Sequence, residues 1–519
     1  MYIYSDFLYN YSKLSFKVVN MTAQFIAKLL AFLLYLGIMI YVGLKNASKN
    51  NSSADFFLGG RKVGPWVTAL SAEASDSSAW LLMGLPGLCY LGGVQESIWT
   101  AVGLILGTYL SWLFVAKPLR KCSIAYGDSI TIPEFLSNRF NDKSHMLSVV
   151  SVIFIVLFFT IYTASGFVAC AKLFNSVFGL NYHAGLAIGL VVILCYTITG
   201  GYTAVCTTDF IQGSLIFIAF VISSIIVIFS IGSGSAPVSV SDVFINFSEL
   251  AGRELQSFNT MGIVSALAWG LGYFGMPHII VRFMGIRSNS EITKARRIGI
   301  VWMVVSYIGA ILIGTLGTVY LKKYGITLDA VSAETVFSAT MQNMYPAFIA
   351  GIFLCAILAA SMSTADSQLL AASSAVSQDI YKGLIKKNAD EKDVLNISRF
   401  TVFLIALIAL FLSLNPESSI FSLVSFAWSG FGGTFGPLIL LALYWKRTTA
   451  CGAVAGLICG GVVDVIWHYL PASISPIFGL YEIVPAFLTC LIVTVVVSLC
   501  TKQDEIVAKK FDDFKQMAD

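Results

Sequence analysis

The stretch TALSAEASDSSAWLLMGLPG, residues 68–87, places an aspartate, Asp76, among small hydroxyl residues inside a long apolar segment. A charged side chain at membrane depth is costly and is rarely present there without a function. Serine and aspartate also compete for backbone hydrogen bonds, so a run of them makes a poor continuous helix. The stretch therefore predicts a broken membrane helix with freed carbonyls, hydroxyls and one carboxylate. These oxygen ligands suit a hard cation such as Na⁺.

The composition of the whole chain is that of a membrane protein. Of its 519 residues, 57% are hydrophobic and only 12% are charged, whereas soluble chains carry about 25% charged residues. Apolar runs long enough to cross a bilayer recur along the chain, so we expect an all-α polytopic membrane protein with about 13 transmembrane helices. The expected spans are 23–44, 65–92, 97–116, 146–174, 183–204, 208–232, 258–281, 298–321, 344–376, 398–414, 419–445, 449–469 and 479–500.

The chain is expected to form one membrane domain, residues 23–500. Residues 1–22 are polar and aromatic and run up to a second methionine, Met21, so we expect a loose N-terminal extension. Residues 501–519 form a short tail. The sequence contains no nucleophile–base set, metal-ligand cluster or phosphate loop, which argues against an enzyme. Nothing in it indicates a nucleic acid or an obligatory protein partner.

The distribution of basic residues sets the expected orientation. If the N-terminus lies outside, most of the 32 Lys and Arg residues fall in inner loops, Arg61, Arg120, Arg282 and Lys382 among them. Loops on the cytoplasmic side carry an excess of Lys and Arg. We therefore predict an outside N-terminus and a cytoplasmic C-terminus.

A second apolar run is also interrupted. Residues 269–277, WGLGYFGMP, place three glycines and a proline inside an expected span. This span lies five spans after the one that contains Asp76. Paired interrupted helices at matching positions point to an inverted repeat of five plus five spans, with the site near the membrane midplane. We place the repeats at about 65–232 and 258–445, with one N-terminal and two C-terminal helices outside them.

A further patch of oxygen ligands lies in residues 356–368, AILAASMSTADSQ, where Ser363 and Thr364 are adjacent. Such hydroxyls often bond only the preceding turn of their own helix. An ion between two helices nevertheless needs ligands from both. Backbone carbonyls of Ala74, Ser77 or Ala79 could then complete the coordination shell.

Other polar and aromatic residues have two interpretations each. Asp209 is either a helix cap or a carboxylate on the inner ion route, and Arg61 is either a membrane anchor or the partner of a gate carboxylate. Four aromatic side chains, three of them beside the breaks, are either packing groups or walls that close over an amphipathic ligand. These are Trp80, Tyr162, Trp269 and Tyr273.

Seven stretches carry a resemblance that covers nearly the whole chain. They are LGGR at 58–61, TALSAEASD at 68–76, WLLMGLPG at 80–87, FFTIYTASG at 158–166, WGLGYFGMPH at 269–278, AILAASMST at 356–364 and GLYEIVP at 479–485. In order and length they resemble the sodium/solute symporter family, and most closely its proline-carrying branch. The resemblance implies a thirteen-helix, LeuT-like inverted repeat in a bacterial cytoplasmic (inner) membrane. It also implies symport of Na⁺ and L-proline by alternating access.

The resemblance also implies roles for individual residues. Gln368 is expected at the edge of the substrate pocket. The implied sodium shell is Ala74, Ser77, Ala360, Ser363 and Thr364; the residues that couple ion to substrate are Arg61, Asp76, Ser78 and Asp209; and the substrate pocket is Trp80, Tyr162, Trp269, Tyr273, Pro277 and Gln368. Na⁺ enters as the transported ion, without a catalytic cofactor.

Two carboxylates depart from the family pattern, Glu73 and Asp366. They could recruit a second cation or a proton, or simply face a water-filled vestibule. Two other functions stay open. One is symport of a different amino acid or a carboxylate, and the other is a transporter-like membrane sensor, although the tail at 501–519 is short for a signalling domain.

Overall fold

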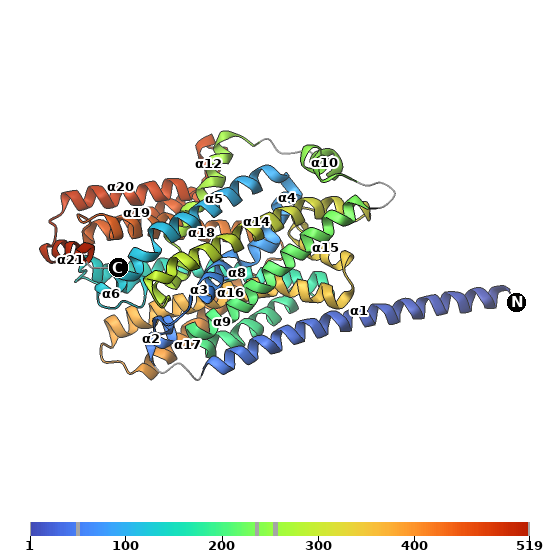
Figure 1. The fold of residues 1–519 in the computed structure, drawn as a ribbon, viewed down its shortest axis with the longest axis horizontal. Helices are drawn as coiled ribbons and strands as arrows, with labels where there is room; N and C mark the ends of the chain where they lie inside the picture. Colours follow the sequence, from blue (N-terminus) through green and yellow to red (C-terminus); the bar gives the residue numbers. More distant parts are fainter. Residues whose placement is uncertain (1, 48–51, 234–237, 253–257, 517–519) are drawn as a thin grey trace.

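The computed structural model describes residues 2–47, 52–233, 238–252 and 258–516 (Figure 1). In these ranges the regular structure is helical, apart from one isolated bridge between Val63 and Ile286. By length and composition, 10 of the described helices can cross a membrane, or up to 11 if a bent pair counts as one span. The all-α membrane architecture is therefore confirmed.

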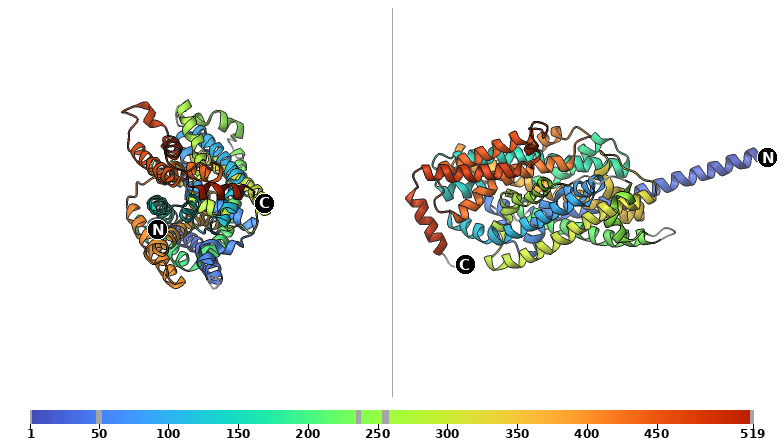
Figure 2. Two further views of the ribbon diagram at one scale, coloured as in Figure 1. Left: turned by 90° about the vertical axis from the view of Figure 1, so that its left-hand side faces the viewer. Right: turned by 90° about the horizontal axis from the view of Figure 1, so that it is seen from above.

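The spanning helices run side by side along the longest dimension of the molecule (Figures 1 and 2). They are α1 (Tyr2–Ala47), α5 (Val94–Phe114), α8 (Met146–Phe178), the second part of α9 (Tyr182–Gly232), α14 (Ile292–Lys323), α16 (Ala347–Ser374) with its continuation η6 (Ala375–Ile385), α17 (Glu391–Leu412), α18 (Ile420–Tyr444), α19 (Ala450–His468) and α20 (Ile483–Cys500). Because α16 packs against α1, α3, α8 and α9, it lies in the middle of the bundle.

Short helices connect the spans or, in the case of α21, follow the last of them. They are α2 (Ser53–Leu58), η1 (Gly59–Arg61), α6 (Ala116–Ala125), α7 (Ile132–Phe140), α10 (Val240–Ile245), α11 (Phe247–Ala251), η4 (Asn289–Glu291), η5 (Ala333–Thr335), α15 (Val336–Met344), η7 (Pro476–Gly479) and α21 (Glu505–Gln516). The helices α2, α6 and α21 lie at the end of the bundle opposite the N-terminus (Figure 1).

The remaining expected spans are interrupted helices. The first is α3 (Pro65–Ala79), η2 (Trp80–Gly84) and α4 (Leu85–Gly92), and the second is α12 (Thr260–Ala268), η3 (Trp269–Phe274) and α13 (Pro277–Gly285), the latter bent by 43°. The expected spans 183–204 and 208–232 form two parts of α9, with non-helical backbone at Gly201, which has φ of 63°. Breaks at both predicted places are thus present, while the total of 13 spans stays a prediction.

The N-terminal extension expected at residues 1–22 stays a prediction. Residues 2–22 are helical and continue into the first span as α1. In Figure 1 this part of α1 projects beyond the rest of the described chain. The domain boundaries predicted from the sequence, including those of the two repeats, stay predictions.

Glycines let the second interrupted helix approach α5 closely. A Cβ atom on Gly107 would lie 2.2 Å from the carbonyl oxygen of Gly270, and one on Gly270 would lie 2.3 Å from that of Gly103. Small residues allow this backbone-to-backbone packing between membrane helices. The position of η3 therefore depends on the absence of a side chain at Gly103 and Gly107 of α5.

We predict that Gly107→Val destabilises the protein, because its side chain overlaps the backbone of η3. The expected loss is about 1–3 kcal/mol, the usual cost of overpacking, measured by thermal unfolding of the protein in detergent. The matched control is Gly37→Val on α1, where no atom lies within 4 Å of an added Cβ. Equal losses in the two variants would contradict the close packing of α5 on η3.

Candidate functional site

The break in the first interrupted helix is at Ser78. This residue has φ of 46° and ψ of −176°, values incompatible with a helix. The backbone N–H of Trp80 donates to the Ser78 hydroxyl at 3.1 Å, and the chain then continues as the wider turn of η2. The serine-rich sequence thus makes the predicted break, because a side-chain oxygen replaces a backbone acceptor.

Three carbonyl oxygens just before this break accept hydrogen bonds from side chains of other helices. Ser363 of α16 donates to Ala74 at 2.9 Å, and Thr364 donates to Ser75 at 2.8 Å. In a nonpolar interior each backbone polar group needs a partner. Side chains of α16 therefore stabilise the interrupted part of α3.

Two more side chains complete this arrangement. The hydroxyl of Tyr162 on α8 donates to the carbonyl of Asp76 at 3.2 Å. A ring nitrogen of His278 on α13 lies 3.2 Å from the carbonyl oxygen of Ser75. Sequence reasoning missed His278, although it directly follows the glycine-rich interruption.

The Asp76 carboxylate joins the two interrupted helices. It is buried and accepts a hydrogen bond from the hydroxyl of Tyr273, which belongs to η3. A carboxylate at one break thus meets a tyrosine at the other. This contact brings two of the predicted residues together across 197 positions of sequence.

The predicted sodium shell is partly assembled. Ser363 also donates to the carbonyl of Ala360 at 3.2 Å, so Ala74, Ala360 and Ser363 lie together. The hydroxyl of Ser77 instead donates within its own helix, to the carbonyl of Glu73 at 2.7 Å. The geometry brings oxygen atoms of α3 and α16 together, and the identity of the ion's ligands stays a prediction.

Aromatic side chains from three segments pack together beside the break. The rings of Trp80 and Trp269 are 5.2 Å apart, and Phe421 of α18 lies 6.1 Å from the first and 5.5 Å from the second. The ring of Tyr273 meets that of Trp428 at 5.0 Å. A substrate between Trp80 and Trp269 therefore requires these rings to separate.

The other two predicted pocket residues, Pro277 and Gln368, have different neighbours. Pro277 begins α13, directly after the interruption. Gln368 on α16 accepts a hydrogen bond from Thr163 at 3.2 Å and is fully buried. The structure thus links Tyr162 to the first break, whereas Gln368 contacts the neighbouring residue of α8, Thr163.

Asp209 on α9 forms a buried ion pair with Arg282 on α13. Its Oδ2 atom accepts from Ser71 at 2.7 Å and lies 3.4 Å from the guanidinium of Arg282. The assignment of Arg282 to an inner loop was wrong, since its side chain is only 1% exposed. The apolar residues on both sides of it, in IIVRFMG at 279–285, were the signal for burial.

Arg61 lies at a different place, at the end of the bundle. It donates to Asp128 at 3.0 Å, to Ser123 at 3.2 Å and to the carbonyls of Met284 and Ser129. Burial lowers the pKa of this guanidinium below its ordinary value, although Asp128 opposes the shift. Arg61 thus joins η1 to the segments beside α13 and α7.

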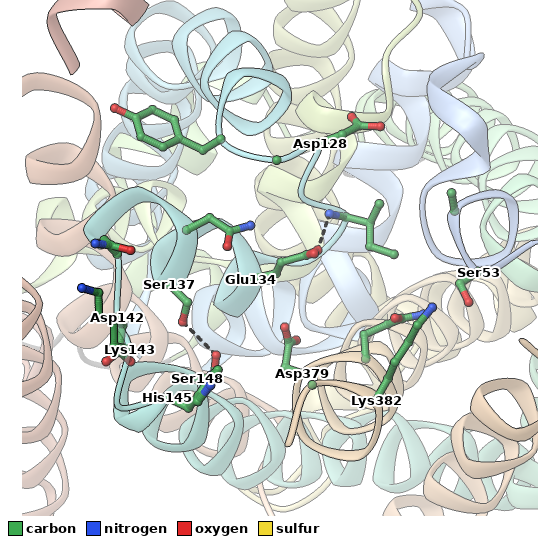
Figure 3. A pocket seen from close by; sticks show the side chains of 18 of the residues that line it. Ser53, Asp128, Glu134, Ser137, Asp142, Lys143, His145, Ser148, Asp379 and Lys382 are labelled. Carbon is green, nitrogen blue, oxygen red and sulfur yellow. Dashed lines mark hydrogen bonds between the residues drawn. The ribbon is translucent and has the colours of Figure 1, made fainter. Parts of the chain in front are cut away.

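A polar cavity of about 800 Å³ lies at this end of the molecule, between α2, α7, α8 and η6 (Figure 3). Asp128, Glu134, Asp379 and Lys382 are among its lining residues. Burial raises the pKa of Glu134 above its ordinary value, although the N–H of Ile130 donates to the carboxylate. The many polar groups that line this cavity are typical of a water-filled vestibule.

A smaller cavity of about 20 Å³ lies deeper, with room for about one water. Its lining includes Thr131, Pro277, Arg282 and Ser367. The hydroxyl of Thr131 lies 2.9 Å from both carboxylate oxygens of Asp379, which lines the large cavity. This pair of side chains therefore stands between the vestibule and the inner residues.

At the opposite end of the bundle, a network of hydrogen bonds surrounds Glu334. This carboxylate accepts from Lys172 at 2.6 Å, and from the Ser419 hydroxyl and the Phe421 backbone N–H at 3.0 Å. Because Phe421 also packs on Trp80 and Trp269, the network holds the aromatic cluster in place from this side.

The two unusual carboxylates are both buried. Glu73 accepts a hydrogen bond from Trp112 at 3.0 Å, and Asp366 accepts one from Ser367 at 3.3 Å. Neither faces a water-filled vestibule, so that interpretation was wrong. Among the described residues no group of three or more His, Cys, Asp or Glu side chains could hold a metal ion.

Two interrupted helices that meet inside an all-helical membrane bundle, with polar groups at both breaks, define a secondary transporter. The sequence model of the sodium:solute symporter family matches residues 56–460. The chain therefore belongs to the sodium:solute symporter family.

Curated relatives cover nearly the whole chain. Sodium/proline symporter 2 of Staphylococcus saprophyticus is 43% identical over 495 residues, 93% of this chain and 94% of the relative. The sodium/proline symporter of Staphylococcus aureus is 43% identical over 484 residues, 91% of this chain and 92% of the relative.

Solved structures share the fold. A Na⁺-coupled sialic acid symporter in a substrate-bound, outward-open state superposes with a TM-score of 0.74 at 20% identity, covering 92% of this chain and 99% of its own. Mhp1, a nucleobase-cation-symport-1 family transporter in a closed conformation, gives 0.51 at 13% identity, covering 90% and 99%. The LeuT-like inverted-repeat fold expected from the sequence is confirmed.

We predict that Ser363→Ala destabilises the protein more than Ser361→Ala. Ser363 donates to Ala74 across the helix interface, whereas Ser361 donates to Ile357 in its own helix. The expected difference is about 1 kcal/mol, the usual net value of one such bond, measured by thermal unfolding without Na⁺. Equal stabilities would contradict the role of Ser363 in joining α16 to α3.

Proposed function

We propose that the protein imports L-proline together with Na⁺, by alternating access. The observation that carries this proposal is the contact between Asp76 and Tyr273, which joins the two interrupted helices. Relatives 43% identical over most of the chain are sodium/proline symporters, which supports the choice of solute. The sodium gradient and the membrane potential then supply the driving force, and the potential contributes about 2.3 kcal/mol per charge per 100 mV.

In this proposal Na⁺ binds between α3 and α16. Its ligands are the carbonyls of Ala74, Ser77 and Ala360 and the hydroxyls of Ser363 and Thr364. Binding at this place pulls oxygen atoms of both helices toward the ion and fixes the conformation of the break. Ion binding thereby fixes the conformation of Asp76 and Ser78, on which the substrate pocket depends.

Proline binds on the other side of the break, where the aromatic rings lie. Its ring packs against Trp80 and Trp269, and its charged ends meet the polar groups near Tyr162 and Tyr273. Aromatic side chains suit a ligand with an apolar body and a positive nitrogen. Pro277 and Gln368 bound the pocket on the side of α13 and α16.

Release takes place toward the polar cavity. The end that carries this cavity also carries Arg61, Arg120 and Lys382, so we assign it to the cytoplasm. With this assignment the proposal has the N-terminus outside and the C-terminus on the cytoplasmic side of a bacterial inner membrane. The protein functions with lipid around it and without an obligatory protein partner.

The test is uptake of labelled L-proline by proteoliposomes with and without an inward Na⁺ gradient. We predict Na⁺-stimulated uptake by the parent, and loss of at least about 10-fold in Asp76→Asn, because its carboxylate joins the two breaks. The matched control is Asp512→Asn, which removes an exposed carboxylate paired with Lys446. It should transport as the parent does.

The outcomes separate the alternatives. Na⁺-driven uptake of another amino acid or of a carboxylate, without uptake of proline, would keep the ion site and change the solute. Binding of proline without any counterflow of labelled proline would instead support a sensor.

We predict that Tyr273→Phe raises the proline concentration for half-maximal uptake about 5- to 10-fold, because the hydrogen bond from the tyrosine hydroxyl to Asp76 is lost. Tyr320→Phe is the matched control, since its hydroxyl donates to the Asn343 carbonyl at 3.1 Å, away from the breaks. Concentration dependence of uptake at saturating Na⁺ measures the effect. A parent-like value in Tyr273→Phe would exclude a role for this contact in the substrate site.

A further inference from the structure

Arg282 is a buried cation that the transport mechanism described above does not use. Its Nε atom donates to Ser71 at 3.2 Å and one Nη atom donates to the carbonyl of His278 at 2.5 Å. The other Nη atom lies 3.4 Å from Asp209 and also donates to Ser367. The guanidinium therefore contacts α3, α9 and α16 from its place on α13.

This contact set includes both interrupted helices. Ser71 lies on α3, two turns before the break at Ser78, and Arg282 lies on α13, directly after the second break. A rearrangement of either interrupted helix must change the distances from the guanidinium to its partners. Arg282 is thus placed where it responds to the conformational change of transport.

Asp209 retains unused ligand capacity. Its Oδ2 atom is shared by Ser71 and Arg282, while Oδ1 is buried and accepts no hydrogen bond from the described residues. Asp366 lies close as a second carboxylate, bonded to Ser367. Ser367 also accepts from Arg282, so a second buried carboxylate lies one hydrogen bond beyond the guanidinium.

Arg282 also separates this carboxylate from the inner route. Arg282 and Ser367 line the small cavity, whereas Asp209 does not. Thr131, on the wall of the same cavity, contacts Asp379 of the large one. An ion that moves from the break to the polar cavity by this route passes the guanidinium.

We propose that Arg282 competes with the transported Na⁺ for Asp209 and thereby promotes release of the ion into the polar cavity. The inference rests on the proposed function, since it takes Na⁺ as the ion and this cavity as the exit. Two cations at one buried carboxylate repel each other strongly. When the guanidinium returns to Asp209 it displaces Na⁺, so the ion is not held at a deep carboxylate.

The test measures the Na⁺ dependence of thermal stability and of proline uptake in Arg282→Gln. Without its competitor, Na⁺ should bind more tightly, so the half-saturating Na⁺ concentration should fall at least about 5-fold. Maximal uptake should fall as well, because release becomes slow. Arg282→Lys keeps the charge and should stay close to the parent in Na⁺ affinity.

The double variant Arg282→Gln/Asp209→Asn distinguishes competition for Na⁺ from a purely structural role of Arg282, because only competition predicts a reversal of the change in Na⁺ affinity. Removing the carboxylate should return the Na⁺ affinity toward the parent value and restore part of the turnover. The matched control is Arg287→Gln, whose side chain is 61% exposed and pairs with Glu291 at the surface. It should leave both quantities unchanged.

Unchanged Na⁺ affinity in Arg282→Gln, or no reversal in the double variant, would overturn the inference. If Arg282→Gln does not fold, the Na⁺ affinity of Asp209→Asn decides: a value equal to that of the parent excludes competition at this carboxylate. A parent that shows Na⁺-dependent stability but takes up no proline would overturn the proposed solute alone, because the stability measurement needs no substrate.

Discussion

An interrupted membrane helix must find partners for its freed backbone polar groups, and the rest of this structure depends on those partners. Without water around it, each freed carbonyl requires a partner, and at the first break the partners are side chains of α8, α13 and α16. Thr364, Tyr162 and His278 thus hold the break by hydrogen bonds and fix the helices that supply them. The carbonyl of Ala74, which accepts from Ser363 of α16, is one of the ligands proposed for the ion, so in that proposal ion binding and helix packing at the break depend on each other.

Buried charges add a second constraint, because each must be paired inside the bundle. Lys172 with Glu334 lies toward one end of the molecule, and Arg282 with Asp209 lies toward the other. Breaking a buried pair by removing one partner costs about 3–5 kcal/mol. The two ion pairs therefore act as strong contacts at opposite ends of the bundle. A protein that opens one end at a time breaks one of these pairs while it keeps the other.

Much of the fold was accessible from the sequence, because its signals are local. Serines around Asp76, and glycines with Pro277, make poor helix, and they located both breaks. The partners of these residues were not accessible, because hydrogen bonds between distant helices leave no pattern in a single sequence. Arg282 shows the reason most clearly: the rule that basic residues lie in inner loops describes an average, and a buried carboxylate such as Asp209 overrides it.

In the proposed mechanism, coupling between ion and solute follows from the position of residues 74–80 between the two proposed sites. The carbonyl of Ala74 faces α16, the carboxylate of Asp76 faces Tyr273, and the ring of Trp80 faces Trp269. These groups belong to one short segment, so a change of its conformation at the ion side alters the substrate side. By linkage, solute binding must then favour ion binding by the same factor. A continuous helix would hold the segment rigid and remove this dependence, which is the physical reason for keeping an unstable break at the centre of the protein.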